Sequence, residues 1–132
     1  KYFKSIARLL SDGGTFIFDC FNGASVFKDN PENFTKGIIS GFTGGEYIMN
    51  CTSDFDPMTS HLKMNYNIRV YHLEELVDEF DYSIDGTTWT PKLLVDLMEK
   101  YNIKVSKIVS NSDYNENATL DDYKITFVCT NG

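Results

Sequence analysis

The sequence predicts an α/β fold that carries an inserted antiparallel β-hairpin or three-stranded meander. Near the start, a helical apolar stripe leads through a Gly-Gly turn into an apolar strand. In the middle the hydrophobic period changes to two, and at the end a helix precedes two strands. With 42% hydrophobic residues, residues 1–132 have the size and composition of a single domain with one modest core.

The first predicted elements are a helix over residues 2–10 and a strand over residues 15–21. Gly13 and Gly14 separate them, because glycine takes the left-handed conformation that ends a helix at little cost. The strand, TFIFDCF, is almost continuously apolar, which predicts a central strand of a parallel α/β unit, buried on both faces. Asp19 lies near its carboxyl end, beyond which ligands of such sheets bind.

The middle of the chain predicts an inserted sheet over residues 46–84. Residues 22–45 are interpreted as a long polar connection with a short helical turn around residues 25–28. From Glu46 apolar and polar residues alternate, and the alternation resumes after a turn at residues 56–60, so we expect a hairpin. Residues 76–84 suit a third strand, although the spacing from Leu73 to Phe80 also suits a helix.

The end of the chain predicts a helix, a strand, a polar loop and a last strand. Thr90 can cap the helix and Pro91 is tolerated in its first turn, while Asn102 suits its left-handed end. The expected buried stripe consists of Leu93, Leu94, Leu97, Met98 and Tyr101. The strands are expected over residues 103–109 and 123–129.

The acidic balance limits the partners of the chain. The formal net charge of −7 and pI near 4.7 argue against a nucleic-acid partner, because that binding depends on clustered Lys and Arg. No apolar run reaches the roughly 20 residues that span a bilayer and no signal-peptide pattern opens the chain, so we expect no membrane association and a cytoplasmic location. The chain opens abruptly with Lys1 at the start of the first predicted helix, so we expect a piece of a longer protein.

Three cysteines, Cys20, Cys51 and Cys129, are odd in number and far apart. They form no CxxC pair and no metal-ligand spacing with a histidine, so we expect buried, reduced thiols. A nucleophilic cysteine served by His61 or His72 is the alternative.

Several stretches resemble the class I S-adenosylmethionine-dependent methyltransferases. LLSDGGTFIFD, residues 9–19, is similar to the segment that forms the fifth strand of that fold. Residues 89–105 begin with WTPKLL and are similar to its last helix and sixth strand, and YKITFV, residues 123–128, to its seventh strand. The stretches follow the order of the family, so the chain is expected to be the C-terminal half of such an enzyme.

The resemblance implies a partial Rossmann-like sheet of strands five, seven and six with the β-rich middle as an insertion. It also implies that the full-length protein transfers a methyl group from S-adenosylmethionine to a small molecule. A non-catalytic binding or regulatory module derived from the same fold is the alternative. A third interpretation is an unrelated α+β domain, which an antiparallel partner for residues 16–20 would indicate.

The cofactor loop of the family is missing from the sequence. In the family a GxGxG turn follows a strand and opens a helix, whereas Gly13-Gly14 follows a helix and precedes a strand. We therefore expect no cofactor and no metal in this chain alone, S-adenosylmethionine in the full-length protein, and no activity from these residues by themselves. Because strand five normally pairs with strand four, an apolar edge at residues 15–21 is expected to allow a homodimer.

Four residues are candidates for binding the substrate, and no catalytic residue is assigned. The resemblance places Asp19, Phe21 and Asn22 near the transferred methyl group, where they would orient the acceptor. Asp19 can instead accept backbone hydrogen bonds at a strand end. His72 is a candidate base, because histidine is the residue type most often used for proton transfer near neutral pH, or an ordinary surface histidine.

Two further groups of side chains have open interpretations. Aromatic residues in or beside the inserted sheet suit either its core or a lid over a small-molecule pocket: Tyr47, Tyr66, Tyr71, Tyr82 and Trp89. An acidic cluster is interpreted as a solvated face, because no loop motif makes its oxygens converge on a cation: Glu74, Glu75, Asp78, Glu79 and Asp81.

Overall fold

A computed structural model of the chain describes residues 2–39 and 44–132 and shows two compact units. Unit 1 comprises Lys1–Asp29 and Thr88–Gly132, and unit 2 comprises Asn30–Thr87. Each unit contains its own sheet, so each is described by itself.

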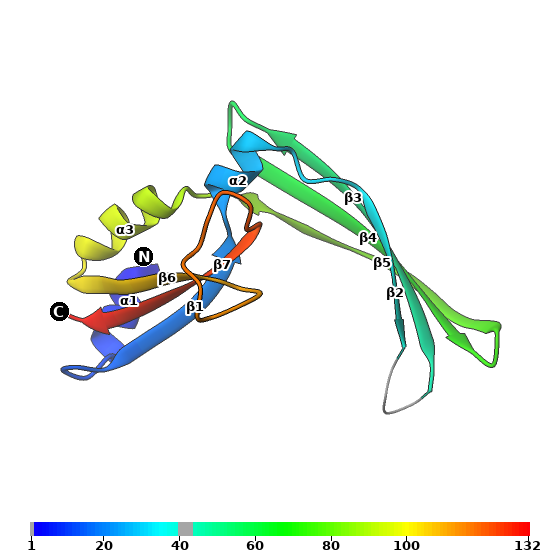
Figure 1. Ribbon diagram of the computed structural model, residues 1–132, viewed down its shortest axis with the longest axis horizontal. Helices are drawn as coiled ribbons and strands as arrows, with labels where there is room; N and C mark the ends of the chain where they lie inside the picture. Colours follow the sequence, from blue (N-terminus) through cyan, green and yellow to red (C-terminus); the bar gives the residue numbers. More distant parts are fainter. Residues whose placement is uncertain (1, 40–43) are drawn as a thin grey trace. The chain divides into compact units, whose positions relative to one another are not determined.

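Unit 1 is an α/β unit built on a three-stranded sheet (Figure 1). Its elements are α1 (Tyr2–Leu9), β1 (Thr15–Phe21), α2 (Gly23–Lys28), α3 (Pro91–Glu99), β6 (Ile103–Ser110) and β7 (Lys124–Asn131). The strand order is β1-β7-β6, and β7 is antiparallel to both neighbours. β1 and β6 therefore run in the same direction, and their carboxyl ends lie at the same edge of the sheet.

The connection from α1 to β1 is the predicted glycine turn. Gly13 has a φ of +72°, in the left-handed region that favours glycine. The Gly14 N–H donates to the Ser11 carbonyl at 2.8 Å, and the Asn131 N–H donates to the Gly14 carbonyl at 3.2 Å. The turn thus fixes the start of β1 beside the end of β7.

The boundaries of α3 also confirm the sequence prediction. The Thr90 hydroxyl accepts a hydrogen bond from the Leu93 N–H at 3.4 Å, and Pro91 occupies the first turn. Asn102 follows the helix with a φ of +62°. Leu94 and Met98 are buried, but Leu93 is 49% exposed, so the predicted apolar stripe is wrong at that position.

The core of unit 1 lies between one face of its sheet and the helices α1 and α3. It contains Phe3 from α1, Leu94 and Met98 from α3, and the strand residues Ile103, Ile125, Phe127 and Cys129. The rings of Phe127 and Phe18 stack with centroids 4.9 Å apart. Alternation along the strands sends every second side chain to this face.

β1 is not the central, doubly buried strand that its composition predicts. Phe16, Phe18 and Cys20 pack against the core, whereas Ile17 on the other face is 60% exposed. Within the part of the chain that the structure describes, β1 pairs with β7 alone. An apolar run of residues predicts a strand, but it does not show whether other segments of the same chain cover both faces of that strand.

The direction of the β1 pairing also differs from the expected parallel unit. β1 pairs antiparallel with β7 from Thr15↔Thr130 to Phe21↔Lys124. The reason is that β7 returns from β6 through the loop of residues 111–123 and enters the sheet between β6 and β1. β1 and β6 do run parallel to each other, but they are not neighbours in the sheet.

Unit 2 is a four-stranded antiparallel meander. Its strands are β2 (Phe34–Ile39), β3 (Glu46–Asp56), β4 (His61–His72) and β5 (Glu75–Thr87), in the order β2-β3-β4-β5. The predicted hairpin and third strand are confirmed. The short helical turn expected around residues 25–28 is confirmed as α2, whereas the interpretation of residues 22–45 as a connection is wrong for β2. Residues 40–43 of that stretch lie outside the described residues.

Two tight turns set the register of unit 2. Asp56 accepts hydrogen bonds from the Thr59 hydroxyl at 2.7 Å and then from the Met58 N–H at 2.9 Å, and these lower the pKa of its carboxyl group. Between β4 and β5, Leu73 and Glu74 have φ values of +49° and +68°, as in a type I′ hairpin turn. These two residues lack the usual turn chemistry, which explains why the sequence of this stretch also suits a helix.

Candidate substrate site

Three candidate residues follow one another at the carboxyl end of β1, but they do not share one surface. Asp19 is exposed and lines a groove, whereas Asn22 is 3% exposed and lines a separate cavity. Phe21 is half-buried, and the Lys124 ammonium lies 5.6 Å from its ring centroid, at cation–π distance. The predicted cluster is therefore divided between two openings of unit 1.

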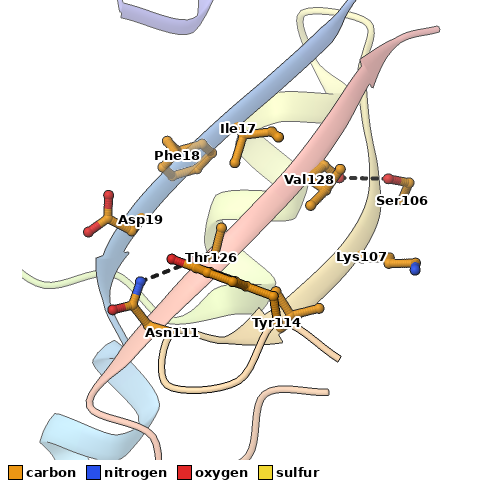
Figure 2. Close-up of a pocket in the computed structure, with 10 residues that line it drawn as sticks. Ile17, Phe18, Asp19, Ser106, Lys107, Asn111, Tyr114, Thr126 and Val128 are labelled. Atoms are coloured by element: carbon orange, nitrogen blue, oxygen red, sulfur yellow. Dashed lines mark hydrogen bonds between the residues drawn. The ribbon is translucent and has the colours of Figure 1, made fainter. Parts of the chain in front are cut away.

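The groove has a volume of about 750 Å³ and is formed by residues of the sheet and of the loop after β6 (Figure 2). It is lined by Ile17, Phe18, Asp19, Ser106, Lys107, Val109, Asn111, Tyr114, Thr126 and Val128. The Asn111 amide donates to the Thr126 hydroxyl at 3.1 Å and holds the loop on β7. A carboxylate, an ammonium and hydroxyl groups around apolar side chains are suited to orient a small polar molecule.

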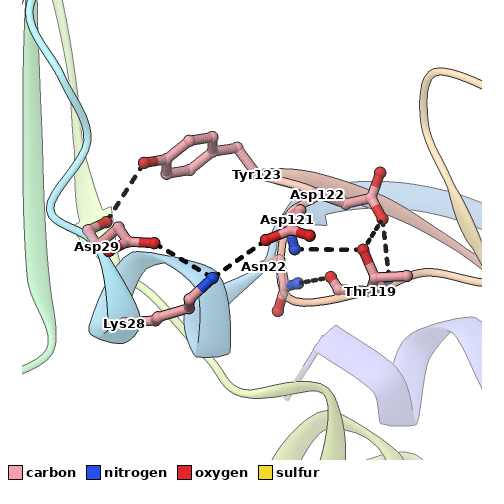
Figure 3. A network of polar contacts seen from close by, with 7 residues as sticks. All are labelled: Asn22, Lys28, Asp29, Thr119, Asp121, Asp122 and Tyr123. Atoms are coloured by element: carbon pink, nitrogen blue, oxygen red, sulfur yellow. Dashed lines mark hydrogen bonds and ion pairs between the residues drawn. The ribbon is translucent and has the colours of Figure 1, made fainter.

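Asn22 connects β1 to α2 and is held firmly by its neighbours. Its N–H donates to the Tyr123 carbonyl at 2.8 Å, and its carbonyl accepts from the Val26 N–H at 3.0 Å. Its side-chain Nδ2 donates to the Thr119 carbonyl at 3.0 Å (Figure 3). Its Oδ1 is buried and has no hydrogen-bond partner among the described residues. Such an unpaired buried acceptor is rare in folded proteins and costs about 1–3 kcal/mol.

Charged contacts tie α2 to the loop between β6 and β7 (Figure 3). The Lys28 ammonium lies 3.0 Å from Asp121 Oδ1 and 3.5 Å from Asp29 Oδ2. Its hydrogen bond to Asp121, and then the charges of both carboxylates, raise the pKa of Lys28. The Tyr123 hydroxyl donates to the Asp29 carbonyl at 3.4 Å.

Asp122 orders the same loop from within. One of its oxygens accepts from the Ser110 hydroxyl at 2.5 Å, and the other accepts from the Thr119 N–H at 2.8 Å. The hydrogen bond from Ser110, followed by those from Thr119, lowers the pKa of Asp122. Because Thr119 also accepts from Asn22, the loop and the end of β1 form one connected network.

His72 lies at the end of β4 in unit 2, whereas Asp19, Phe21 and Asn22 belong to unit 1. It is exposed and stands opposite Glu75 in the register of β4 and β5. The other histidine, His61, is exposed beside the hairpin turn, as predicted, and its Nε2 lies 2.7 Å from Asp85 Oδ1. The role of His72 as a base stays a prediction.

The aromatic candidates differ in exposure. Tyr66 is buried and stacks on Tyr82 with ring centroids 4.6 Å apart, and burial, followed by neighbouring Cys51, raises its pKa to about 12. Tyr82 and Trp89 are 44% and 41% exposed, while Tyr47 and Tyr71 are half-buried. Tyr66 therefore belongs to the packed face of unit 2, and the lid role stays a prediction for the others.

The acidic cluster of unit 2 is exposed, as the sequence predicts. Within it, Glu79 accepts from the Asn67 amide and the Arg69 guanidinium, each at 2.9 Å, and these hydrogen bonds, that of Asn67 first, lower its pKa. In the described ranges, 2–39 and 44–132, no group of three or more His, Cys, Asp or Glu side chains is arranged to hold a metal ion. Among the same residues, no helix has the length and apolar character to span a membrane.

All three cysteines are free thiols, with Cys51 and Cys129 buried and Cys20 half-buried. Burial, together with the nearby Asp19 charge, raises the pKa of Cys20 to about 11, and burial raises that of Cys129 to about 11. A thiol reacts as its thiolate, which forms for Cys20 only as the pH approaches 11. These values argue against a nucleophilic role for either residue.

We therefore expect Cys20 to react slowly with iodoacetamide at pH 8. A pKa raised from 9.0 to about 11 reduces the thiolate fraction about 100-fold relative to an unperturbed cysteine. Mass spectrometry of the alkylated native chain against free cysteine measures the ratio, with the urea-unfolded chain as the control. Rapid alkylation of Cys20 in the native chain would restore it as a candidate nucleophile.

The described glycines on either side of β1 do not form a loop that fits S-adenosylmethionine. Gly13 and Gly14 connect α1 to β1, so their N–H groups do not open a helix that follows a strand. Gly23 does open α2 after β1, but the space next to its Cα is filled by the Trp89 carbonyl, at 2.5 Å from an added Cβ. The backbone at Gly23 therefore packs against the Trp89 segment and leaves no room beside it for a cofactor.

By sequence, no protein-family model and no curated protein matches the chain. By structure, 99% of the chain matches 50% of an S-adenosylmethionine-dependent methyltransferase from Clostridium acetobutylicum, with TM-score 0.75 and 18% identity. The CcbJ methyltransferase from Streptomyces caelestis matches with TM-score 0.63 and 16% identity, over 98% of this chain and 51% of its own. An amino pentose methyltransferase of calicheamicin biosynthesis from Micromonospora echinaspora, solved with S-adenosylmethionine bound, matches with TM-score 0.63 and 14% identity over 98% and 49%.

These matches define the class of fold. The chain has the fold of one half of an S-adenosylmethionine-dependent methyltransferase, with a partial Rossmann-like sheet and an inserted antiparallel sheet. It spans about half the length of the solved methyltransferases that it matches. The expectation that an antiparallel partner for residues 16–20 would indicate an unrelated fold is wrong, because the match includes that pairing.

Proposed function

We propose that this chain is the C-terminal, acceptor-side part of a methyltransferase domain whose full-length protein methylates a small molecule. The observation that supports this most is the match of 99% of the chain to half of a methyltransferase. In this proposal residues 46–84 form a β insertion in the domain, the cofactor loop belongs to the remaining half, and the 132 residues alone are inactive. The free cysteines support a cytoplasmic location.

The acceptor is proposed to lie near the carboxyl end of β1. Asp19 contributes a carboxylate to a groove of about 750 Å³, a volume within the usual range of small-molecule sites. Phe21 and Asn22 complete the proposed set in unit 1. In unit 2, His72 is a separate candidate for binding the substrate, as a residue that could remove a proton if the acceptor carries one. The net charge of −7 favours a small molecule over a nucleic acid as the acceptor. One of the solved proteins of similar fold is an amino pentose methyltransferase.

The test starts from the gene and its full product. An upstream reading frame that encodes a strand followed by a GxGxG turn is expected, and the longer product is expected to transfer a labelled methyl group to small amines or alcohols. The 132-residue chain under the same conditions is the control and is expected to give no product. A complete gene without such a segment would instead favour the non-catalytic binding or regulatory module.

We also propose that the isolated chain forms a homodimer through the edge of β1. Ile17 is 60% exposed on this strand, and β1 has one partner among the described residues, so its other edge can pair with a second copy. Light scattering at high concentration is expected to give a dimer that Ile17→Lys converts to a monomer. Ile39→Lys, at an exposed isoleucine on edge strand β2, is the matched control. A monomeric wild-type chain contradicts the dimer.

A further inference from the structure

The sheet of unit 2 has one polar face and one apolar face. Side chains alternate along its strands, and the register of β2, β3, β4 and β5 places every second residue of each strand on a common face. The polar face carries most of the charges: Asp54, Lys63, Arg69, Glu79, Asp81 and Asp85. The other face, called the apolar face below, gathers aromatic and aliphatic side chains: Phe34, Ile38, Tyr66, Phe80, Tyr82 and Ile84.

The apolar face is covered at its centre and open at its edges. Cys51 and Met64 on the central strands are buried, whereas β2 and β5 form the two edges (Figure 1). Among its described residues unit 2 contains no helix, and a sheet with one apolar face needs a second layer to bury that face. Five large side chains of the edge strands are 40–47% exposed: Phe34, Ile38, Phe80, Tyr82 and Ile84.

The exposed part of the apolar face is large enough for a contact between two proteins. A fully covered aromatic side chain buries about 150–250 Å², so five large side chains that are exposed by about two-fifths leave roughly 400 Å² of apolar surface. The largest patch on a typical monomer measures about 300–600 Å² and is often functional. Two such faces, together with their half-buried neighbours, bury about 1,000 Å², the lower limit of a specific interface.

Two opposite charges at the edges of the apolar face indicate what covers it. Lys36 lies on β2 at one edge, and Asp78 lies opposite Val70 on β5 at the other edge, in the neighbouring cross-strand row. In the described part of the chain, neither side chain forms an ion pair. A two-fold axis parallel to the strands lays β2 of one copy over β5 of another, which brings each Lys36 near Asp78 of the second copy. A second copy therefore complements the face in charge and in apolar character.

We propose that the apolar face of unit 2 packs on the same face of a second copy, with β2 of each copy over β5 of the other. The two sheets then form a sandwich whose layers are about 10 Å apart. This contact adds to the pairing of the β1 edges in unit 1. Because its area is at the lower limit of specific interfaces, the dimer of the chain needs both contacts.

Two neighbouring isoleucines of β2 test the apolar face directly. Ile38 lies on the apolar face and Ile39 on the polar face, although Ile39 is the more exposed, at 74% against 43%. In sedimentation equilibrium of the 132-residue chain, Ile38→Lys is expected to raise the dissociation constant of the dimer at least about tenfold, because an ammonium would be buried among apolar side chains. Ile39→Lys is expected to leave the constant unchanged. Equal effects of the two substitutions overturn the proposal.

Charge reversal gives a second test that does not depend on Ile38→Lys folding. Lys36→Asp is expected to weaken the dimer, because it places two carboxylates together, and adding Asp78→Lys is expected to restore it. Lys63→Asp, on the polar face, changes the charge equally and is expected to have no effect. A double variant that is no tighter than Lys36→Asp alone overturns the proposal.

The rings of Phe34 and Tyr82 give a direct signature of the contact. They lie in one cross-strand row, but β2 and β5 are three strand spacings apart, about 14 Å within one sheet. In a mixture of ¹³C-labelled and unlabelled chains, a nuclear Overhauser contact between the two rings is expected from labelled to unlabelled copies. A dimeric sample without this contact overturns the proposal.

The variants also separate this contact from the pairing of the β1 edges. A dimer that is lost with Ile17→Lys but kept with Ile38→Lys overturns this inference alone. A dimer that is lost with Ile38→Lys but kept with Ile17→Lys overturns the β1 pairing. A monomeric wild-type chain overturns both.

Discussion

Met98→Ala is expected to lower the free energy of unfolding by about 2–5 kcal/mol. Met98 is 0% exposed and lies in the core of unit 1, with its sulfur 3.8 Å from the Cys129 sulfur. Removing its side chain loses buried apolar contacts and leaves a cavity between α3 and β7. Urea denaturation followed by the fluorescence of Trp89, the single tryptophan, measures the loss.

Met58→Ala is the matched control because Met58 is 91% exposed in a turn of unit 2. Its substitution is expected to change the free energy of unfolding by no more than about 0.5 kcal/mol. Equal effects of the two substitutions would contradict the packing of α3 against the sheet.

Gly23→Ala is expected to destabilise the chain by about 3 kcal/mol, at the upper end of overpacking effects. A Cβ at Gly23 would lie 2.5 Å from the Trp89 carbonyl carbon and oxygen and 2.9 Å from the Thr90 nitrogen. These are backbone atoms, so the turn between β1 and α2 must move away from the start of α3. The move also breaks the hydrogen bond of 3.1 Å from the Gly23 N–H to the Trp89 carbonyl.

Helix propensity alone predicts the opposite sign, because alanine is favoured over glycine in a helix by about 0.5–1 kcal/mol. Gly37→Ala in β2 is the control, since an added Cβ there meets nothing within 4 Å. Thermal unfolding of both variants decides between the two effects. A Gly23→Ala chain as stable as wild type would show that the Trp89 segment does not approach this turn.

Local signals in the sequence predict most elements of the fold. The glycine turn before β1, the Thr90-Pro91 start of α3 and the left-handed Asn102 act within a few residues, so the pattern of residues alone identifies them. The alternation of β3 and β4 is equally local. The sequence does not predict β2, because its six residues are all exposed and show no buried face.

The candidate site depends on contacts that the sequence pattern does not contain. Thr126 lies between the core residues Ile125 and Phe127, so alternation places it on the other face of β7, where it is also buried, but does not identify its partner Asn111. Lys107 and Tyr114 join the groove only because β6 carries a register shift and its loop folds back over the sheet. Asp19 and Asn22 are close in sequence, yet alternation and the turn into α2 direct them to different openings.

The chain has the fold of half of a methyltransferase, and we propose that the cofactor site belongs to the other half. Isothermal titration of the 132-residue chain with S-adenosylmethionine tests it most directly, with the full-length product as the positive control. We predict no saturable binding to the chain alone, because its glycine turns do not form a cofactor loop. Micromolar or tighter binding by the isolated chain would contradict the claim.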